Sequence, residues 1–263
     1  MQVPATPLWV GMTAAMVSEA FSHTIVAPIE RIKLVQRLRC GWGEDISMAS
    51  LFKGHSAKLC CIGVHNLVKA HVSYLLTRYT NLSVTSNHFL SYLSGKLVSY
   101  PFVVLQVRMA LPSAPGNEGV FQVAQHIVKQ EGWSALFCGI GPFLSASLVY
   151  YGGYRWMYAA FPSSIPSSRP SATFNSIVKR SFIAIIAALT IYPIVTLSLE
   201  MAARNVSAGT AMQTVCQRGL NGSLYAGAGF LLLHTPLLTS LGHVCTQVVI
   251  PRLSIIRLNS NWV

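Results

Sequence analysis

Long apolar stretches with few charges dominate the chain, and they predict helices that cross a membrane. The stretches cover roughly residues 7–38, 55–80, 84–111, 140–161, 171–204 and 228–250. Each is long enough to cross about 30 Å of hydrocarbon. Several contain Ser, His, Lys and Tyr, which at membrane depth face protein or a water-filled cavity rather than lipid. We therefore expect an all-α membrane protein with six transmembrane helices.

A proline and a glycine recur along these stretches and divide them into three pairs. The first stretch of each pair contains a proline, which kinks a helix: Pro28, Pro101 and Pro193. An aromatic-x-Gly triplet opens the second stretch of each pair and ends at Gly54, Gly139 and Gly227. The pattern predicts a single domain of three two-helix repeats, at approximately residues 1–80, 81–163 and 164–263.

Composition supports the membrane assignment. The chain has 52% hydrophobic and 10% charged residues, with a mean hydropathy of +0.49, which does not fit a soluble domain. A net charge of +12 could indicate a nucleic-acid partner, but no basic run is longer than Lys179-Arg180. We therefore expect no nucleic acid, and anionic lipid headgroups as the partner of the basic residues.

Two further features concern the compartment. The six cysteines show no CxxC spacing and are interpreted as buried or reduced thiols. The first twenty residues contain Glu19 and no basic residue, so neither a secretory signal nor an Arg-rich cleavable presequence is expected. Any targeting signal is expected to be internal, with an uncleaved N-terminus.

The order of these pieces resembles the mitochondrial carrier family. The family signature is P-x-[DE]-x-x-[KR], followed by [DE]-G and then aromatic-[KR]-G. The first repeat matches it with PIERIK at residues 28–33 and with Phe52-Lys53-Gly54. The second repeat keeps Glu131-Gly132, and the third has Arg218 where the acid should be.

The first repeat is most similar to that of the ADP/ATP carriers, and Tyr150 and Tyr154 match tyrosines on the corresponding helix of that subfamily. The resemblance implies a six-helix barrel with pseudo-threefold symmetry in the mitochondrial inner membrane, with both termini toward the intermembrane space. It also implies alternating access, in which one ring of ion pairs closes each mouth of the cavity.

The chain departs from the family at both rings. The acid and base positions of the second and third proline motifs hold Val103, Gln106, Val195 and Ser198. Glu30 and Lys33 therefore lack partners in the neighbouring motifs, and we expect them to pair with each other on one helix. The residual matrix gate is predicted to consist of Pro28, Glu30, Lys33, Pro101, Gln106 and Pro193. No acid lies on an expected even-numbered helix, so the opposite ring cannot form.

The expected cavity is also unlike that of an anion carrier. Positions that face the cavity in ADP/ATP carriers give these candidate residues: His23, Lys96, Cys61, Tyr150 and His234. Lys96 is the one certain cation among them, and packing between helices is the alternative for both histidines. No nucleophile–base pair, phosphate-binding loop or metal-ligand cluster is evident elsewhere, so we expect neither an enzyme nor a metal or organic cofactor.

Lipid binding is a function that needs no gates. In the family fold, cardiolipin phosphates bind at helix N-termini, where free N–H groups and the helix dipole favour an anion. The corresponding positions are Lys53, Gly54, Gly139 and Gly227. The lost gates favour a structural or lipid-binding accessory subunit of a larger membrane complex, such as a respiratory-chain or ATP-synthase assembly. The alternative is an active mitochondrial carrier that exchanges a small metabolite, and a six-span protein of unrelated fold also remains open.

Overall fold

The six long helices lie where the sequence predicts them. The computed structural model describes residues 8–38, 48–111, 119–161, 170–219 and 224–259, and these residues contain no strand. The long helices are α1 (Leu8–Leu38), α2 (His55–Tyr79), α3 (Val84–Ala110), α5 (Ile140–Ala160), α6 (Pro170–Arg204) and α9 (Leu231–Asn259). The prediction of an all-α carrier-type fold is confirmed.

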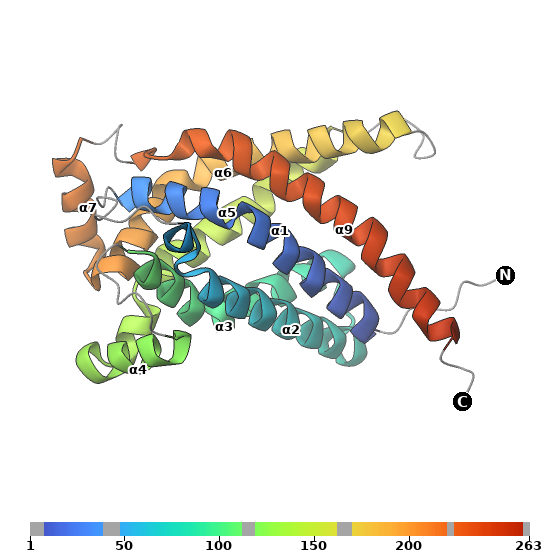
Figure 1. Cartoon of the computed structure of the whole chain (residues 1–263), viewed down its shortest axis with the longest axis horizontal. Coiled ribbons are helices and arrows are strands. Elements are labelled where there is room, and N and C mark those ends of the chain that lie inside the picture. Colours follow the sequence, from blue (N-terminus) through green and yellow to red (C-terminus); the bar gives the residue numbers. More distant parts are fainter. Residues whose placement is uncertain (1–7, 39–47, 112–118, 162–169, 220–223, 260–263) are drawn as a thin grey trace.

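Shorter helices connect the long ones. They are α4 (Val120–Glu131), α7 (Ala208–Gln217), η1 (Ala49–Phe52), η2 (Trp133–Phe137) and η3 (Ala228–Phe230). Both α4 and α7 lie at one end of the molecule, and the start of α1 and the end of α9 lie at the opposite end (Figure 1). The cysteines at positions 60, 61, 138, 216 and 245 form no disulfide, whereas Cys40 lies outside the described residues.

Four helical segments of the described chain are long and apolar enough to cross a membrane. They are Ser50–Tyr79, Trp133–Ala160, Phe174–Arg204 and Ala228–Cys245. The two remaining long helices, α1 and α3, contain charged residues such as Glu30, Lys33 and Lys96. These charges are compatible with a span only where they face the interior of the barrel.

Three close contacts join the repeats into a ring. Gly54, Gly139 and Gly227 precede α2, α5 and η3 with φ angles of 82°, 85° and 75°, in the left-handed region that favours glycine. A Cβ atom at these positions would lie 2.7, 2.6 and 3.0 Å from the carbonyl oxygens of Gln106, Ser198 and Lys33, respectively. Each oxygen belongs to the fifth residue after a kink proline. Only glycine allows the start of one helix to approach the next repeat so closely.

Tyrosines fasten two of these corners. Tyr100 and Tyr192 each stand directly before a kink proline. Their hydroxyl groups donate hydrogen bonds to the carbonyl oxygens of Cys138 and Ala226, at 2.6 and 2.8 Å. Each acceptor directly precedes a corner glycine. Because both tyrosines are fully buried, these bonds fix the start of the second helix of a repeat to the kink of the first.

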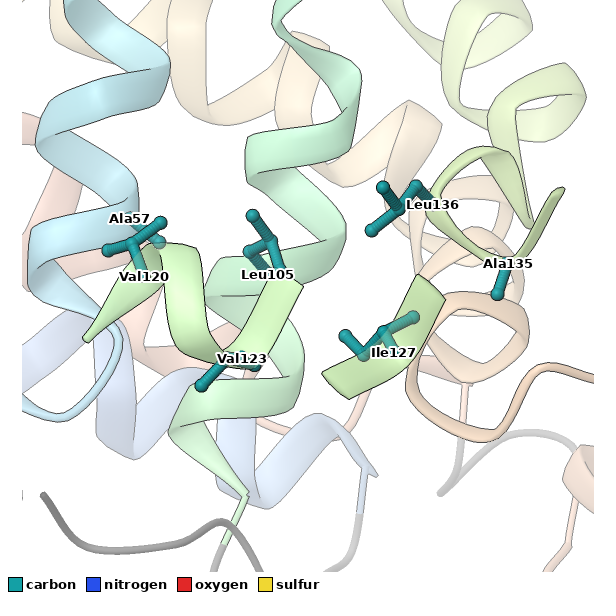
Figure 2. Close-up of a cluster of buried hydrophobic side chains, with 7 residues drawn as sticks. All are labelled: Ala57, Leu105, Val120, Val123, Ile127, Ala135 and Leu136. Atoms are coloured by element: carbon teal, nitrogen blue, oxygen red, sulfur yellow. The ribbon is translucent and has the colours of Figure 1, made fainter. Parts of the chain in front are cut away.

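The short helix α4 packs beneath the second repeat through one apolar face. Val120, Val123 and Ile127 recur at spacings of three and four residues, as expected for an amphipathic helix, and they are buried. They pack with Leu105 of α3 and Ala57 of α2 (Figure 2). This contact fixes α4 against α2 and α3 near the Gly54 corner.

The corner contacts predict that Gly139→Ala destabilises the protein. The new methyl group meets the Ser198 carbonyl oxygen, and the left-handed backbone adds a strain of about 1–3 kcal/mol. We expect a melting temperature several degrees lower in detergent. Gly141→Ala is the matched control, because Gly141 has no atom within 4 Å of its ideal Cβ position. Equal melting temperatures of the two variants would contradict the role of the corner.

Candidate functional site

A cavity near the start of α1 and the end of α5 is built around one tyrosine. Tyr154 lines three adjoining pockets with volumes of about 420, 400 and 250 Å³. The largest also contains Ser18, Glu19 and His23 of α1 and Thr239 of α9. These volumes lie within or near the range of small-molecule sites.

Stacked tyrosines form one wall of this cavity. Tyr150, Tyr154 and Tyr158 recur every fourth residue on α5, so they lie on one helix face. Successive ring centroids are 6.1 Å apart, with interplanar angles of 24° and 14°. Tyr151 stacks on Tyr92 of α3 with centroids 5.1 Å apart. The wall therefore presents aromatic faces along more than two helical turns.

Cations surround the tyrosine wall. Arg180 lines the two larger pockets, Arg155 lines two pockets, and Lys69 lines the smallest. The ammonium group of Lys96 lies 5.4 Å from the centre of the Tyr92 ring, within cation–π distance. Of these cations, only Lys96 was predicted from the sequence, because the other basic residues do not stand at the positions that face the cavity in ADP/ATP carriers.

Glu30 lies at the inner end of the cavity among residues from three helices. Its Oε1 atom lies 2.6 Å from Nδ1 of His23 on α1, 3.1 Å from Nε2 of His234 on α9, and 3.9 Å from Nζ of Lys58 on α2. All four side chains are largely buried, and the exposed fraction of the Glu30 side chain is 12%. The carboxylate therefore connects the first and third repeats.

The expected ion pair between Glu30 and Lys33 is wrong. Among the described residues, the ion pairs of Glu30 are with His23, His234 and Lys58. A glutamate side chain leans toward the N-terminus of its helix, so Glu30 extends back toward His23 and away from Lys33. The signal that was missed is the convergence of His23 and His234, which were considered separately as cavity residues.

An apolar cluster lies further along the three proline-kinked helices than the acid and base positions of the motif. Its buried centre contains one residue from each proline-kinked helix: Leu38 of α1, Val107 of α3 and Leu199 of α6. Leu34 and Val195 pack against it. Val103 packs against a neighbouring cluster that contains Tyr100 and Val104. We call Leu38, Val107 and Leu199 the apolar plug.

The other predicted residues have packing contacts. The Cys61 thiol donates to the Ser99 carbonyl oxygen at 3.7 Å, which places it against α3. Pro28, Pro101 and Pro193 lie inside α1, α3 and α6. Gln106 contributes its backbone oxygen to the Gly54 corner.

An ion pair lies at equivalent positions in the second and third repeats, but the acid and the base are exchanged between the two positions. Arg108 is the seventh residue after Pro101, and its guanidinium binds both carboxylate oxygens of Glu131, with Nη2 2.9 Å from Oε2. Glu200 is the seventh residue after Pro193, and its Oε1 lies 3.1 Å from Nη1 of Arg218. The acid and base have exchanged places, so the Arg218 that seemed to break the motif has a partner. Comparing Arg108 with Glu200 in the sequence could have revealed this exchange.

Glu200 is the more buried carboxylate of the two pairs. Its side chain is 2% exposed, and it also lies 2.9 Å from Nε of Arg204. Arg218 reaches further, to the carbonyl oxygen of Leu38 at 3.2 Å. The pair therefore links α6 to the segment after α7 and to the end of α1.

Comparisons with known proteins agree with this geometry. The family model described as mitochondrial carrier protein matches residues 85–168. Similar proteins include the thylakoid ADP,ATP carrier protein of Arabidopsis thaliana, which is 24% identical over 69% of this chain and 50% of its own length. A probable envelope ADP,ATP carrier protein of the same plant is 25% identical over 73% and 57% of the two chains.

A third relative is the mitochondrial adenyl nucleotide antiporter of Mus musculus. It is 27% identical over 55% of this chain and 34% of its own length. The matched part of this chain thus covers between about a third and just over half of the length of these relatives.

The exchanged ion pair predicts compensation between two charge reversals. Glu200→Arg alone places a buried cation beside Arg218 and Arg204, and breaking a buried pair costs about 3–5 kcal/mol. Adding Arg218→Glu restores an attractive contact and should recover part of the lost melting temperature. A double variant no more stable than Glu200→Arg would show that the two side chains are not coupled.

The Arg108–Glu131 pair predicts a dependence of stability on pH. Hydrogen bonds from the Arg108 guanidinium lower the pKa of the Glu131 carboxyl group. A lowered pKa in the folded state contributes stability above the unfolded pKa of about 4.3, which is lost as pH falls through the folded value. Thermal unfolding of wild type and Glu131→Gln should differ at neutral pH and converge below about pH 4. A difference that persists unchanged into acid would contradict this origin.

Proposed function

Because the chain belongs to the mitochondrial carrier family, we propose that it is a solute carrier that exchanges an anionic metabolite of the nucleotide type by alternating access. The observation that carries the proposal is the cavity, in which the face of stacked tyrosines and the cations Arg155, Arg180 and Lys69 meet around Tyr154. A nucleotide offers a flat base and a phosphate chain, which match these two kinds of surface.

The chemistry of the wall supports this substrate class. Tyrosine rings bind aromatic bases by stacking, and arginine guanidinium groups bind phosphate through two parallel hydrogen bonds. The described acids near this cavity are few, and Glu19 accepts a hydrogen bond from Asn66 at 2.7 Å. The names of the similar proteins, ADP,ATP carrier and adenyl nucleotide antiporter, make adenine nucleotides the first compounds to test.

In this proposal the apolar plug closes the matrix side of the cavity. Opening separates Leu38, Val107 and Leu199, and it breaks the contacts of Glu30 with His234 and Lys58. His23, Lys96, Cys61, Tyr150 and His234 then line the path of the solute, as the sequence suggested.

The proposal also covers the membrane in which the protein lies and a lipid bound to it. The relatives include mitochondrial and plastid proteins, and we propose the mitochondrial inner membrane, with both termini toward the intermembrane space. Cardiolipin is proposed as a bound lipid near Gly54, Gly139 and Gly227, with Lys53 adding charge at the first corner. The comparisons favour the carrier over the accessory subunit that the lost ion rings suggested.

Transport by the purified protein in liposomes tests the proposal. Labelled ATP or ADP should enter by saturable exchange for internal nucleotide, and Arg180→Gln and Tyr154→Leu should each lower the exchange rate at least about tenfold, a loss of about 1.4 kcal/mol. Lys129→Gln on α4, remote from the cavity, is the matched control and should exchange like wild type.

The alternative outcomes separate the functions. Exchange of phosphate, a carboxylate or an amino acid but not a nucleotide would keep the carrier and overturn the nucleotide class. A folded protein that exchanges none of these solutes, and that copurifies in stoichiometric amounts with other membrane subunits, would overturn the carrier and restore the accessory subunit.

A further inference from the structure

We infer that His23, Glu30 and His234 form a binding site for a divalent first-row transition metal ion such as Zn²⁺ or Co²⁺. The side chains come from α1 and α9, which are remote in sequence, and they meet at the inner end of the cavity. The inference does not depend on the proposed nucleotide exchange, because it concerns binding of a cation by the resting protein.

The geometry suits three ligands to one ion. Nδ1 of His23, Nε2 of His234 and a carboxylate oxygen of Glu30 all lie within 4.8 Å of one another. Ligand atoms at a tetrahedral zinc centre, with bonds of about 2.0–2.2 Å, lie roughly 3.3 Å apart. The present separations of 2.6 and 3.1 Å from Glu30 Oε1 therefore require only a small movement of side chains.

The ligand set selects the class of metal. Two imidazoles and one carboxylate suit zinc, cobalt and iron, whereas magnesium and calcium prefer oxygen ligands alone. Three protein ligands leave a coordination position open. His23 also lines the largest pocket, so water or an anionic solute in that pocket lies beside the site and can occupy the open position.

Without a metal, the same atoms form hydrogen bonds. Each histidine nitrogen that faces Glu30 donates its hydrogen to the carboxylate oxygen. A neutral imidazole carries one N–H, so moving that proton to the other ring nitrogen frees the lone pair that a metal needs.

Lys58 opposes the metal and provides a second way to test the site. Its ammonium group lies 3.9 Å from Glu30 Oε1, and a dication at the site would be repelled by this charge. Removing the charge should strengthen metal binding, whereas removing a ligand should weaken it. A purely structural cluster gives no reason for these opposite effects.

A bound ion would also act on the barrel. It would join α1 to α9 at the level where the cavity closes, and the binding free energy would stabilise that state over any state in which the helices separate. The site thus couples cation occupancy to the conformation in which α1 and α9 lie together at this level.

Cobalt binding to the purified full-length protein in detergent tests the inference. Titration with Co²⁺ should produce visible d–d absorption of a low-symmetry site at one equivalent, and Zn²⁺ should displace it. His23→Gln and His234→Gln retain an amide that can donate to Glu30 but lose the imidazole ligand. Each should weaken Co²⁺ binding by at least about tenfold, and Lys58→Gln should tighten it several-fold.

His243→Gln is the matched control, because this histidine lies on the same helix and lines the same pocket but is outside the cluster. It should bind Co²⁺ like wild type. As a second readout, Zn²⁺ should raise the melting temperature of wild type and His243→Gln but not of Glu30→Gln. Absence of a one-equivalent site, or equal binding by wild type and both cluster variants, would overturn the inference whatever the transport assay shows.

Discussion

The ring of repeats depends on three places where a glycine touches a carbonyl oxygen of the next repeat. Gly54, Gly139 and Gly227 meet the oxygens of Gln106, Ser198 and Lys33. All three oxygens occupy the position at which the family motif has its gate base. Because the contact uses the backbone, the side chain at that position can be Gln, Ser or Lys without loss of the corner. This explains how the barrel persists although most of the gate motif has been replaced.

The charged residues can differ from the family motif for the same reason, because the corner contacts use the backbone and leave the side chains free to change. Because the backbone corners fix the positions of the helices, an acidic residue can stand at a different position in each repeat, provided that its basic partner changes position as well. The exchange of acid and base between Arg108–Glu131 and Glu200–Arg218 is one case. Glu30 is the other, since its partners are now cavity histidines and Lys58. The buried carboxylates Glu30 and Glu200 each keep a partner, because a buried charge left alone is costly.

The sequence predicted the fold far better than the site. Hydrophobic length predicted five of the long helices to within one residue, because membrane spans are set by a local physical requirement. The sixth, α9, continues nine residues past its predicted end, to Asn259. The partners of Glu30 could not be read in this way, since His234 lies 204 positions away and helix spacing made Lys33 the local choice. Arg155 and Arg180 were missed for the same reason. Their importance depends on which helices border the cavity near Tyr154, and no local pattern contains that information.

The lost ion ring does not by itself exclude turnover. Burying a leucine or valine side chain contributes about 1.5–3 kcal/mol, and a partly exposed ion pair contributes about 0–1 kcal/mol. In the proposed carrier, burial of Leu38, Val107 and Leu199 would therefore stabilise the closed state at least as firmly as a ring of three such pairs. A carrier needs two closed states of similar free energy rather than ions as such. In the proposed carrier, the plug satisfies this requirement at its end of the cavity if the open state gains comparable contacts with a bound solute.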